Sequence, residues 1–478
     1  MALVFDNTYA RLPELFFSRT PPHAPRAPEL GVFNWPLARR LGLEAADEAT
    51  LARWFSGAEP PPGAEPISQA YAGHQFGGFS ILGDGRASLL GEVVAPDGRR
   101  FDIQLKGSGR TPFSRRGDGK AALGPMLREF LVSEAMQALG VATTRSLAVV
   151  ATGEGVARED MLPGAVLTRV ASSHLRVGTF QYAQALRDRE ALSTLVEYAL
   201  ARHAPERAGA ARPAPALFDH VMEKQIDLVA AWMRVGFIHG VMNTDNMAIS
   251  GETIDYGPCA FLDDYHPLTV FSSIDERGRY AFANQPRIAA WNLARFAEAL
   301  LPLFADEAQA AIDLAQQRID AFEPRFRARW IAMMRGKLGL IEAREEDGAL
   351  ADDLLSWMAD EGADYTNTFR ALAEGETEGA PFDGEAARAW LTRWRARRAA
   401  QGRDDEAGAL MRANNPVVIP RNHLVEAALK AASEAGDLAP FEALLRVLAR
   451  PYEMREGLER FRAPPQPQER VRATFCGT

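Results

Sequence analysis

The chain has 478 residues, 47% hydrophobic and 24% charged, which is an ordinary globular composition with enough length for two domains. Its net charge of −9 argues against duplex nucleic acid as a partner, because such binders need a broad basic face. No segment approaches the roughly 18 uncharged apolar residues of a transmembrane helix, so we expect no membrane contact. The start carries Asp6 and no apolar core of signal-peptide length, so we expect a cytoplasmic protein.

The two cysteines are too few for a disulfide framework. Cys259 lies in the middle of the chain, and Cys476 lies third from the end. Two interpretations stay open at this point. The thiols are either unrelated groups in a reducing cytosol, or they form a redox-switchable bridge that holds the tail against the segment around Cys259.

The first third of the chain has the pattern of a β-sheet with extended wrapping segments. Residues 20–28 and 58–66 are rich in proline and predict such wrapping segments. In the run from Arg100 to Lys106 apolar and polar residues alternate, so a strand there points Lys106 away from the apolar face. With glycine-containing turns between them, the expected strands are 79–82, 88–94, 100–106, 146–150 and 165–168.

The remainder of the chain is predominantly helical in pattern. A first helix begins at Pro125 and ends at Gly140, within the β-rich part. From about residue 178 apolar residues recur at helical spacing, most clearly over 218–234. Residues 286–455 are nearly all helical in pattern, except for a polar segment at 396–408 that we expect to be a solvated connection.

This order of elements predicts an α+β fold of the bilobal, protein-kinase-like type. The small β-rich N-terminal lobe would comprise residues 1–170, with the wrapping segments, the strands and one helix. The large, mostly helical C-terminal lobe would comprise residues 171–478. The hinge between them would lie near 169–178.

The segment from His239 to Asn246 resembles the catalytic loop of a protein kinase, His-Arg-Asp-x-x-x-x-Asn. In that loop the Asp accepts the substrate's hydroxyl proton and the Asn binds a metal. Here His239 and Asn246 keep the spacing, but Val241 stands at the position of the Asp and cannot accept a proton. A carboxylate appears instead at Asp245, and Asp255 follows in Asp-Tyr-Gly. The metal-binding parts are therefore kept, which indicates different chemistry on the same nucleotide.

Lys106 and Glu129 have the separation of a kinase's phosphate-binding lysine and its orienting glutamate. A lysine in a closing cleft needs such a partner because its desolvation is costly. Glu134, one turn further along, is the competing partner. Asn246 and Asp255 are expected to bind Mg²⁺ or Mn²⁺, since hard divalent ions prefer carboxylate and amide oxygens together with nucleotide phosphates.

Glycine and arginine residues form further candidate phosphate contacts. Gly83-Asp84-Gly85-Arg86 lies between two predicted strands, where backbone N–H groups could cover phosphates, although a plain hairpin turn explains it equally well. Residues 111–120 form a basic, glycine-flanked loop, and Arg169 and Arg176 lie at the hinge. Arginine makes bidentate contacts with phosphate, so these groups would suit a triphosphate held in an unusual orientation; solvated surface arginines are the alternative.

Taken together, these segments resemble the selenoprotein O (YdiU-type) family. Members of that family are kinase-fold proteins once called pseudokinases, which bind ATP flipped relative to kinases and transfer AMP to Ser, Thr or Tyr hydroxyls of proteins. A uridylyl-transferring activity with Mn²⁺ is also attributed to bacterial members. The resemblance covers nearly the whole chain and rests on residues 104–109, 111–115, 169–176, 239–246 and 415–421.

The resemblance implies a protein adenylyltransferase that uses ATP (or UTP) with Mg²⁺ or Mn²⁺, modifies protein substrates and acts as a monomer. It implies catalytic roles for Lys106 and Glu129, the role of proton acceptor for Asp245, and metal binding for Asn246 and Asp255. A γ-phosphoryl kinase that uses Asp245 as a displaced base, and an inert nucleotide-binding scaffold, are the rival interpretations. The implied nucleotide contacts are Gly83, Gly85, Arg86, Lys106, Asp118, Gly119, Arg169, Arg176 and Asp255.

Overall fold

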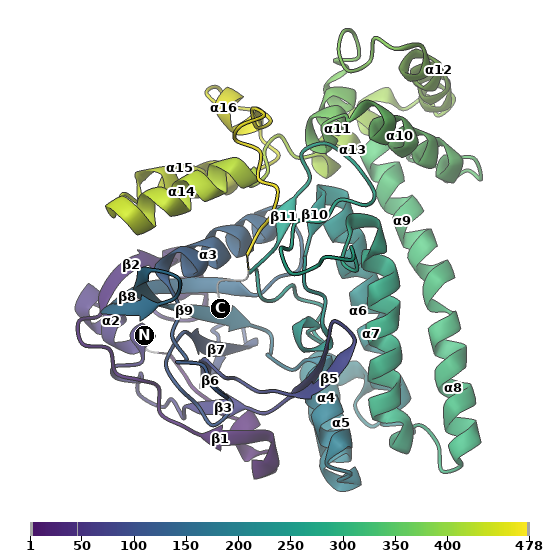
Figure 1. The fold of residues 1–478 in the computed structure, drawn as a ribbon. Coiled ribbons are helices and arrows are strands. Elements are labelled where there is room, and N and C mark those ends of the chain that lie inside the picture. Colours follow the sequence, from purple (N-terminus) through teal and green to yellow (C-terminus); the bar gives the residue numbers. More distant parts are fainter. Residues whose placement is uncertain (1–2, 45, 476–478) are drawn as a thin grey trace.

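The structure, a computed structural model, describes residues 3–44 and 46–475 and has an α+β fold. Its main element is a seven-stranded antiparallel sheet with the strand order β1-β3-β6-β7-β9-β8-β2 (Figure 1). The strands are β1 Phe17–Arg19, β2 Glu29–Phe33, β3 Ile67–Gln69, β6 Ala87–Val94, β7 Arg100–Lys106, β8 Arg145–Ala157 and β9 Met161–Ala171.

The two faces of this sheet have different environments. Ile103 and Leu105 of β7 are fully buried in an apolar cluster with the helices α1 (Trp35–Arg40) and α2 (Glu48–Ser56). Because side chains alternate along a strand, Gln104 and Lys106 point to the opposite face. The alternation read from the sequence therefore explains why a lysine is brought to the interior side of the sheet.

Helix α3 (Leu123–Ala138) packs against β8 and β9, and two helices from the end of the chain cover it (Figure 1). These are α14 (Asn422–Ala435) and α15 (Ala439–Leu448), which share an apolar cluster with α3. Phe130 and Phe441 are in contact there, with ring centroids 6.3 Å apart. The end of the chain thus returns to support the first helix of the β-rich part.

Most of the remaining chain is helical, as expected. Helix α6 (Pro213–Val235) is followed by Gly236, whose positive φ of 72° stops the helix. Residues 239–246, which we call the kinase-like loop, come shortly after it. A short two-stranded sheet, β10 (Phe237–Ile238) and β11 (Ala260–Phe261), flanks that loop. The helices are α4 Val177–Ala185, α5 Arg189–His203, α6 Pro213–Val235, α7 Gln285–Leu300, α8 Ala308–Asp320, α9 Phe322–Leu338, α10 Asp347–Glu361, α11 Tyr365–Glu374, α12 Glu385–Ala399, α13 Asp404–Asn414 and α16 Glu459–Arg462.

The last strand of the main sheet ends at Ala171, and the next element is α4. The change from strand to helix therefore falls close to the expected hinge, while a division into lobes at residue 170 stays a prediction. Within residues 3–44 and 46–475, no helix has the length and apolar character needed to cross a membrane.

The strand expected at 79–82 is present as β5 (Gly78–Ile81), but it pairs only with β4 (Ala72–Gln75) and lies outside the main sheet. One local prediction was wrong. The segment 396–408 is not a solvated connection but contains the end of α12 and the start of α13. Its polar composition was misleading because Arg397 is buried against Asp347, with Nε 2.8 Å from Oδ1.

Arg421 provides a test of how the last part of the chain is held. Its guanidinium is buried and contacts Asp263 Oδ1 at 2.8 Å and Asp364 Oδ2 at 2.6 Å. Arg421→Ala leaves two carboxylates without their cation, so we expect the free energy of unfolding in urea to fall by about 3–5 kcal/mol. Arg446→Ala, which removes an exposed pair with Glu442, should cost less than about 1 kcal/mol. Equal losses in the two variants would contradict this account of Arg421.

Candidate active site

Four charged side chains meet on the interior side of the main sheet. Lys106 Nζ donates to Glu129 Oε2 at 2.7 Å and also to Asp255 Oδ1. Arg169 donates through Nε to Glu129 Oε1, and through Nη2 to Asp255 Oδ1 at 3.0 Å. Each cation therefore bridges both carboxylates. The competing partner Glu134 does not contact Lys106, because it pairs with Arg145 instead.

The cations keep both carboxylates of this cluster ionised. Burial alone would raise the pKa of Asp255, but Lys106, Arg169 and Arg86 outweigh it and hold that pKa well below its usual range. Burial also opposes the charge of Glu129, whose pKa is nevertheless lowered by Arg169 and Lys106. The cluster is thus made of two cations and two anions, and it presets the position of Lys106.

The kinase-like loop is tied to the turn that carries Asp255 by His239. Val241 N donates to His239 Nδ1 at 3.3 Å, so the proton of the ring lies on Nε2, which donates to Ile254 O at 2.9 Å. Burial lowers the pKa of His239, which keeps the ring neutral. The His239 imidazole thus holds the backbone of Ile254, the residue directly before Asp255, and so fixes the position of Asp255 relative to the loop.

Asp245 is the most unusual carboxyl group at this loop. Its side chain is 7% exposed, and its Oδ1 has no hydrogen-bond partner, while Oδ2 accepts only a long bond of 3.4 Å from Gln75 Nε2. Burial raises the pKa of Asp245 to about 6. A Cβ on Gly73 would lie 2.3 Å from Asp245 Oδ1, so only glycine allows this approach. The pKa of Asp245 therefore lies closer to neutrality than that of an ordinary aspartate, and its role as the proton acceptor stays a prediction.

Asp245 lines a cavity of about 290 Å³, which we call the glycine-loop cavity. Gly83 lies at its wall with φ of 139°, and a Cβ there would lie 2.4 Å from the Phe113 ring, so the turn and the 111–120 loop interlock. The turn is not a hairpin, because it joins β5 and β6, which do not pair. The lining includes six of the sequence-derived residues: Gly83, Gly85, Arg86, Asp118, Gly119 and Asp245.

Asp118 lines this cavity, whereas Arg176 does not. Arg176 donates through Nη1 to Asp245 O at 3.2 Å, and its guanidinium lies 4.2 Å from the centroid of the Tyr71 ring. Its Nη2 is buried without a partner. Asp118 pairs with Arg158 Nη1 at 2.9 Å at the rim of the cavity. Arg176 thus has donor capacity left for a ligand, whereas Asp118 is engaged within the protein.

Asn246 and Asp255 keep oxygen atoms available for a divalent cation. Asn246 donates through Nδ2 to Val241 O at 3.0 Å and shares no hydrogen bond with Asp255 in the described structure. Asp255 contacts both Lys106 and Arg169 through Oδ1, which leaves Oδ2. This donor set fits Mg²⁺ or Mn²⁺. The described residues contain no group of three or more His, Cys, Asp or Glu that could hold a metal, so nucleotide phosphates would have to complete the coordination shell.

The sequence reasoning missed the β4–β5 hairpin, which caps the kinase-like loop. His74 N donates to Thr244 Oγ1 at 2.7 Å, and Phe76 N donates to Asn243 Oδ1 at 3.0 Å. With the bond from Gln75 to Asp245, three successive hairpin residues hold three successive loop residues. The run Ala72-Gly73-His74-Gln75-Phe76-Gly77-Gly78 contained the signal, because Phe76-Gly77 before a second glycine is typical of a tight hairpin turn.

Of the two cysteines expected to form a bridge, the structure describes only Cys259. Cys259 is a buried free thiol, and burial raises its pKa to about 12. Cys476 lies outside the described residues. The described tail does reach this region, because Thr474 Oγ1 donates to Pro258 O at 2.6 Å. The pairing of the two cysteines stays a prediction.

The comparisons with known proteins agree with the sequence resemblance. The family described as Protein adenylyltransferase SelO matches residues 1–449. The chain belongs to this SelO family. Relatives named Protein nucleotidyltransferase YdiU include those of Alcanivorax borkumensis, 56% identical over 99% of this chain and 98% of the relative, and of Anoxybacillus flavithermus, 57% identical over 99% of each. The relative of Rhizobium etli is 56% identical over 100% of this chain and 98% of its own length. As a SelO member, the chain is an enzyme of the nucleotidyltransferase class.

The buried charge of Asp245 has a consequence for stability. Its folded pKa lies above the unfolded value of 3.8, so the ionised form destabilises the fold as the pH rises through about 6. We expect Asp245→Asn to raise the free energy of unfolding at pH 7 by at most about 3 kcal/mol, with the gain vanishing near pH 4. Asp118→Asn is the matched control, because Arg158 lowers the pKa of Asp118 and its loss should stabilise nothing. Urea unfolding at both pH values measures this, and a destabilised Asp245→Asn variant would contradict it.

Proposed function

We propose that this chain is a protein adenylyltransferase that transfers AMP from ATP to Ser, Thr or Tyr hydroxyls of proteins and releases pyrophosphate. The observation that carries this proposal is the position of Asp245. The buried Asp245 carboxyl group lines the same cavity as the glycine turn, while Val241 stands where a kinase has its base. The fold is proposed to be bilobal and kinase-like, with lobes over residues 1–170 and 171–478.

In the proposed reaction ATP lies reversed relative to its pose in a kinase, so that its α-phosphorus faces Asp245. The Asp245 carboxylate accepts the proton of the acceptor hydroxyl, and the hydroxyl oxygen forms a bond to the α-phosphorus. The bond from the α-phosphorus to the bridging oxygen breaks, and pyrophosphate leaves with the electron pair. A pKa of about 6 suits this role, because the carboxylate is ionised at neutral pH yet still basic.

The arginine and lysine residues are proposed to neutralise the leaving pyrophosphate. Lys106 and Arg169 are fixed by Glu129, which supports their role as preorganised phosphate ligands rather than mobile surface charges. Arg86, which lines the glycine-loop cavity, and Arg176, which contacts Asp245 and Tyr71, would add further donors. A divalent cation held by Asn246 and Asp255 would supply charge neutralisation at the phosphates.

ATP labelled at either the α- or the γ-phosphorus tests the proposal directly. The protein is incubated with Mg²⁺, each labelled nucleotide, and test peptides that contain Ser, Thr or Tyr. Label from the α position should appear on peptide, at a rate that rises as the pH passes about 6 and then levels off. Label transferred only from the γ position would establish a kinase, and no transfer of either would establish a scaffold. Parallel reactions with α-labelled UTP and Mn²⁺ report uridylyl transfer.

Asp255→Asn tests the assignment of the metal. Asn keeps the shape of Asp and tolerates the positive φ of 67° at this position, so the fold should be retained. Loss of the carboxylate should slow α-label transfer by roughly a hundredfold or more and weaken its dependence on Mg²⁺ concentration. Thermal unfolding serves as the control for folding. Transfer at the wild-type rate, with unchanged Mg²⁺ dependence, would remove Asp255 from the proposed metal site.

A further inference from the structure

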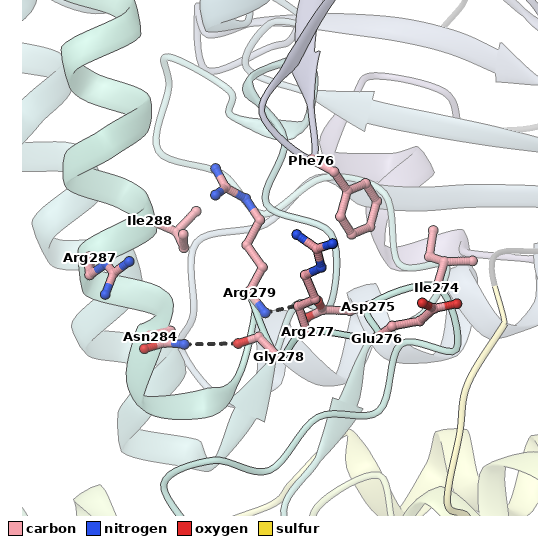
Figure 2. A pocket seen from close by; sticks show the side chains of 10 residues that line it. All are labelled: Phe76, Ile274, Asp275, Glu276, Arg277, Gly278, Arg279, Asn284, Arg287 and Ile288. Atoms are coloured by element: carbon pink, nitrogen blue, oxygen red, sulfur yellow. Dashed lines mark hydrogen bonds between the residues drawn. The ribbon is translucent and has the colours of Figure 1, made fainter.

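A second cavity lies on the other side of the kinase-like loop. It has a volume of about 490 Å³ and lies between residues 274–279, the start of α7 and the tip of the β4–β5 hairpin (Figure 2). We call it the arginine cavity. Gln75 lines the glycine-loop cavity, and the next residue, Phe76, lines the arginine cavity. The hairpin tip therefore divides one cavity from the other.

The arginine cavity is connected to the reacting end of the loop through Asn243. Asn243 Oδ1 accepts hydrogen bonds from Phe76 N at 3.0 Å and from Tyr280 Oη at 2.6 Å. Asp245, two residues further along, lines the other cavity. The loop thus contacts a wall of the arginine cavity through Asn243 and lines the glycine-loop cavity through Asp245, an arrangement suited to a reaction between two separately bound substrates.

The charge of the arginine cavity is positive in a chain whose net charge is −9. Arg277, Arg279 and Arg287 line it, and Arg277 and Arg279 extend from the loop toward the same side as the Phe76 ring (Figure 2). The lining also holds two carboxylates, so its net charge is +1 (three arginines against two acids). Asp275 is buried and accepts the backbone N–H of Arg279 at 2.9 Å, so it serves its own loop, whereas Glu276 is exposed. The salt bridges of the described residues do not use Arg277 or Arg287.

Phe76 adds an apolar contact at a conformational cost. Its φ is 50° and that of Gly77 is 92°, so a bulky residue occupies the left-handed first position of a tight turn, which is a strained conformation. One edge of the ring packs on Tyr280, with ring centroids 5.2 Å apart. Its side chain is nonetheless 40% exposed, and Ile274 at the other side of the cavity is 53% exposed. The exposed part of the Phe76 ring is therefore open to an apolar group of a ligand.

We propose that the arginine cavity binds the acceptor protein, through an extended segment that carries an acidic side chain close to the modified hydroxyl. The carboxylate of that side chain would pair with Arg277, because a guanidinium group binds a carboxylate in a bidentate manner. An apolar neighbour would pack on Phe76 and Ile274. A basic segment would instead meet guanidinium groups of like charge, which gives discrimination. This inference rests on the proposed function and names its acceptor class.

The test uses α-labelled ATP and a peptide library in which Asp, Lys or Ala is placed at each position flanking a central Ser, Thr or Tyr. The wild-type protein should label peptides with Asp at one or two flanking positions about five- to tenfold better than the same peptides with Lys, mainly through KM. Arg277→Glu should reverse that preference. Arg446→Glu, on the exposed surface of α15, is the matched control and should keep the wild-type preference.

Phe76→Asn is a second, independent variant. Asn is favoured at positive φ, so the thermal unfolding temperature should not fall, while KM for peptides with an apolar flanking residue should rise. A purely structural role for Phe76 predicts the opposite, a lower unfolding temperature with unchanged KM.

The outcomes separate this inference from the proposed function. Label from the α position with equal rates on acidic and basic peptides, or a preference that Arg277→Glu leaves unchanged, would overturn the inference alone. Weaker ATP binding by Arg277→Glu, measured by displacement of a fluorescent ATP analogue, would assign these arginines to the nucleotide and also overturn it. Absence of α-label on every peptide with the wild-type protein would instead contradict the proposed function.

Discussion

Lys106 and Arg169 each bond to both Glu129 and Asp255, and these four side chains come from β7, β9, α3 and the turn after the kinase-like loop. A buried charge is stable only if its partners are present, so the four elements can pack together only in the register that closes this cluster. Asp255 differs from Glu129 in being partly exposed, with 26% of its side chain accessible against 3%. Glu129 is thus the enclosed partner of the two cations, and Asp255 is the carboxylate of the cluster that solvent reaches.

Asp255 bonds to two cations, whereas among the residues that the structure describes Asp245 has no cation partner and only one long hydrogen bond from Gln75. Both are carboxylates of one site, but cations hold the pKa of Asp255 low while burial raises that of Asp245. Two carboxylates whose environments push their pKa values apart are suited to different tasks, one as a permanent anion and one as a proton acceptor. The difference arises from the hairpin, because Gly73 and Gln75 cover Asp245 without supplying it with a cation.

Much of the fold and part of the site could be predicted from the sequence, and the reasons differ between elements. Strand β7 and helix α6 have one apolar face each, so their periodicity was informative. Lys106 lies on a strand and Glu129 on the next helix, so the number of residues between them was enough to predict that they meet. The hairpin was missed because His74, Gln75 and Phe76 act through backbone N–H groups and an amide on a loop far away in the chain. Arg397 was misread because a buried ion pair has the same composition as a solvated surface.

The packing of α14 and α15 on α3 has a consequence for synthesis of the chain on the ribosome. Helix α3, which carries Glu129, emerges about 300 residues before its cover, and at about 5–20 residues per second that interval lasts roughly 15–60 seconds. Throughout it, the apolar side of α3 around Phe130 lacks Phe441 and its neighbours. The nascent β-rich part therefore exposes an apolar surface of the kind that chaperones bind. Helix α3, which carries Glu129 of the four-charge cluster, is packed on both sides only after translation is nearly complete.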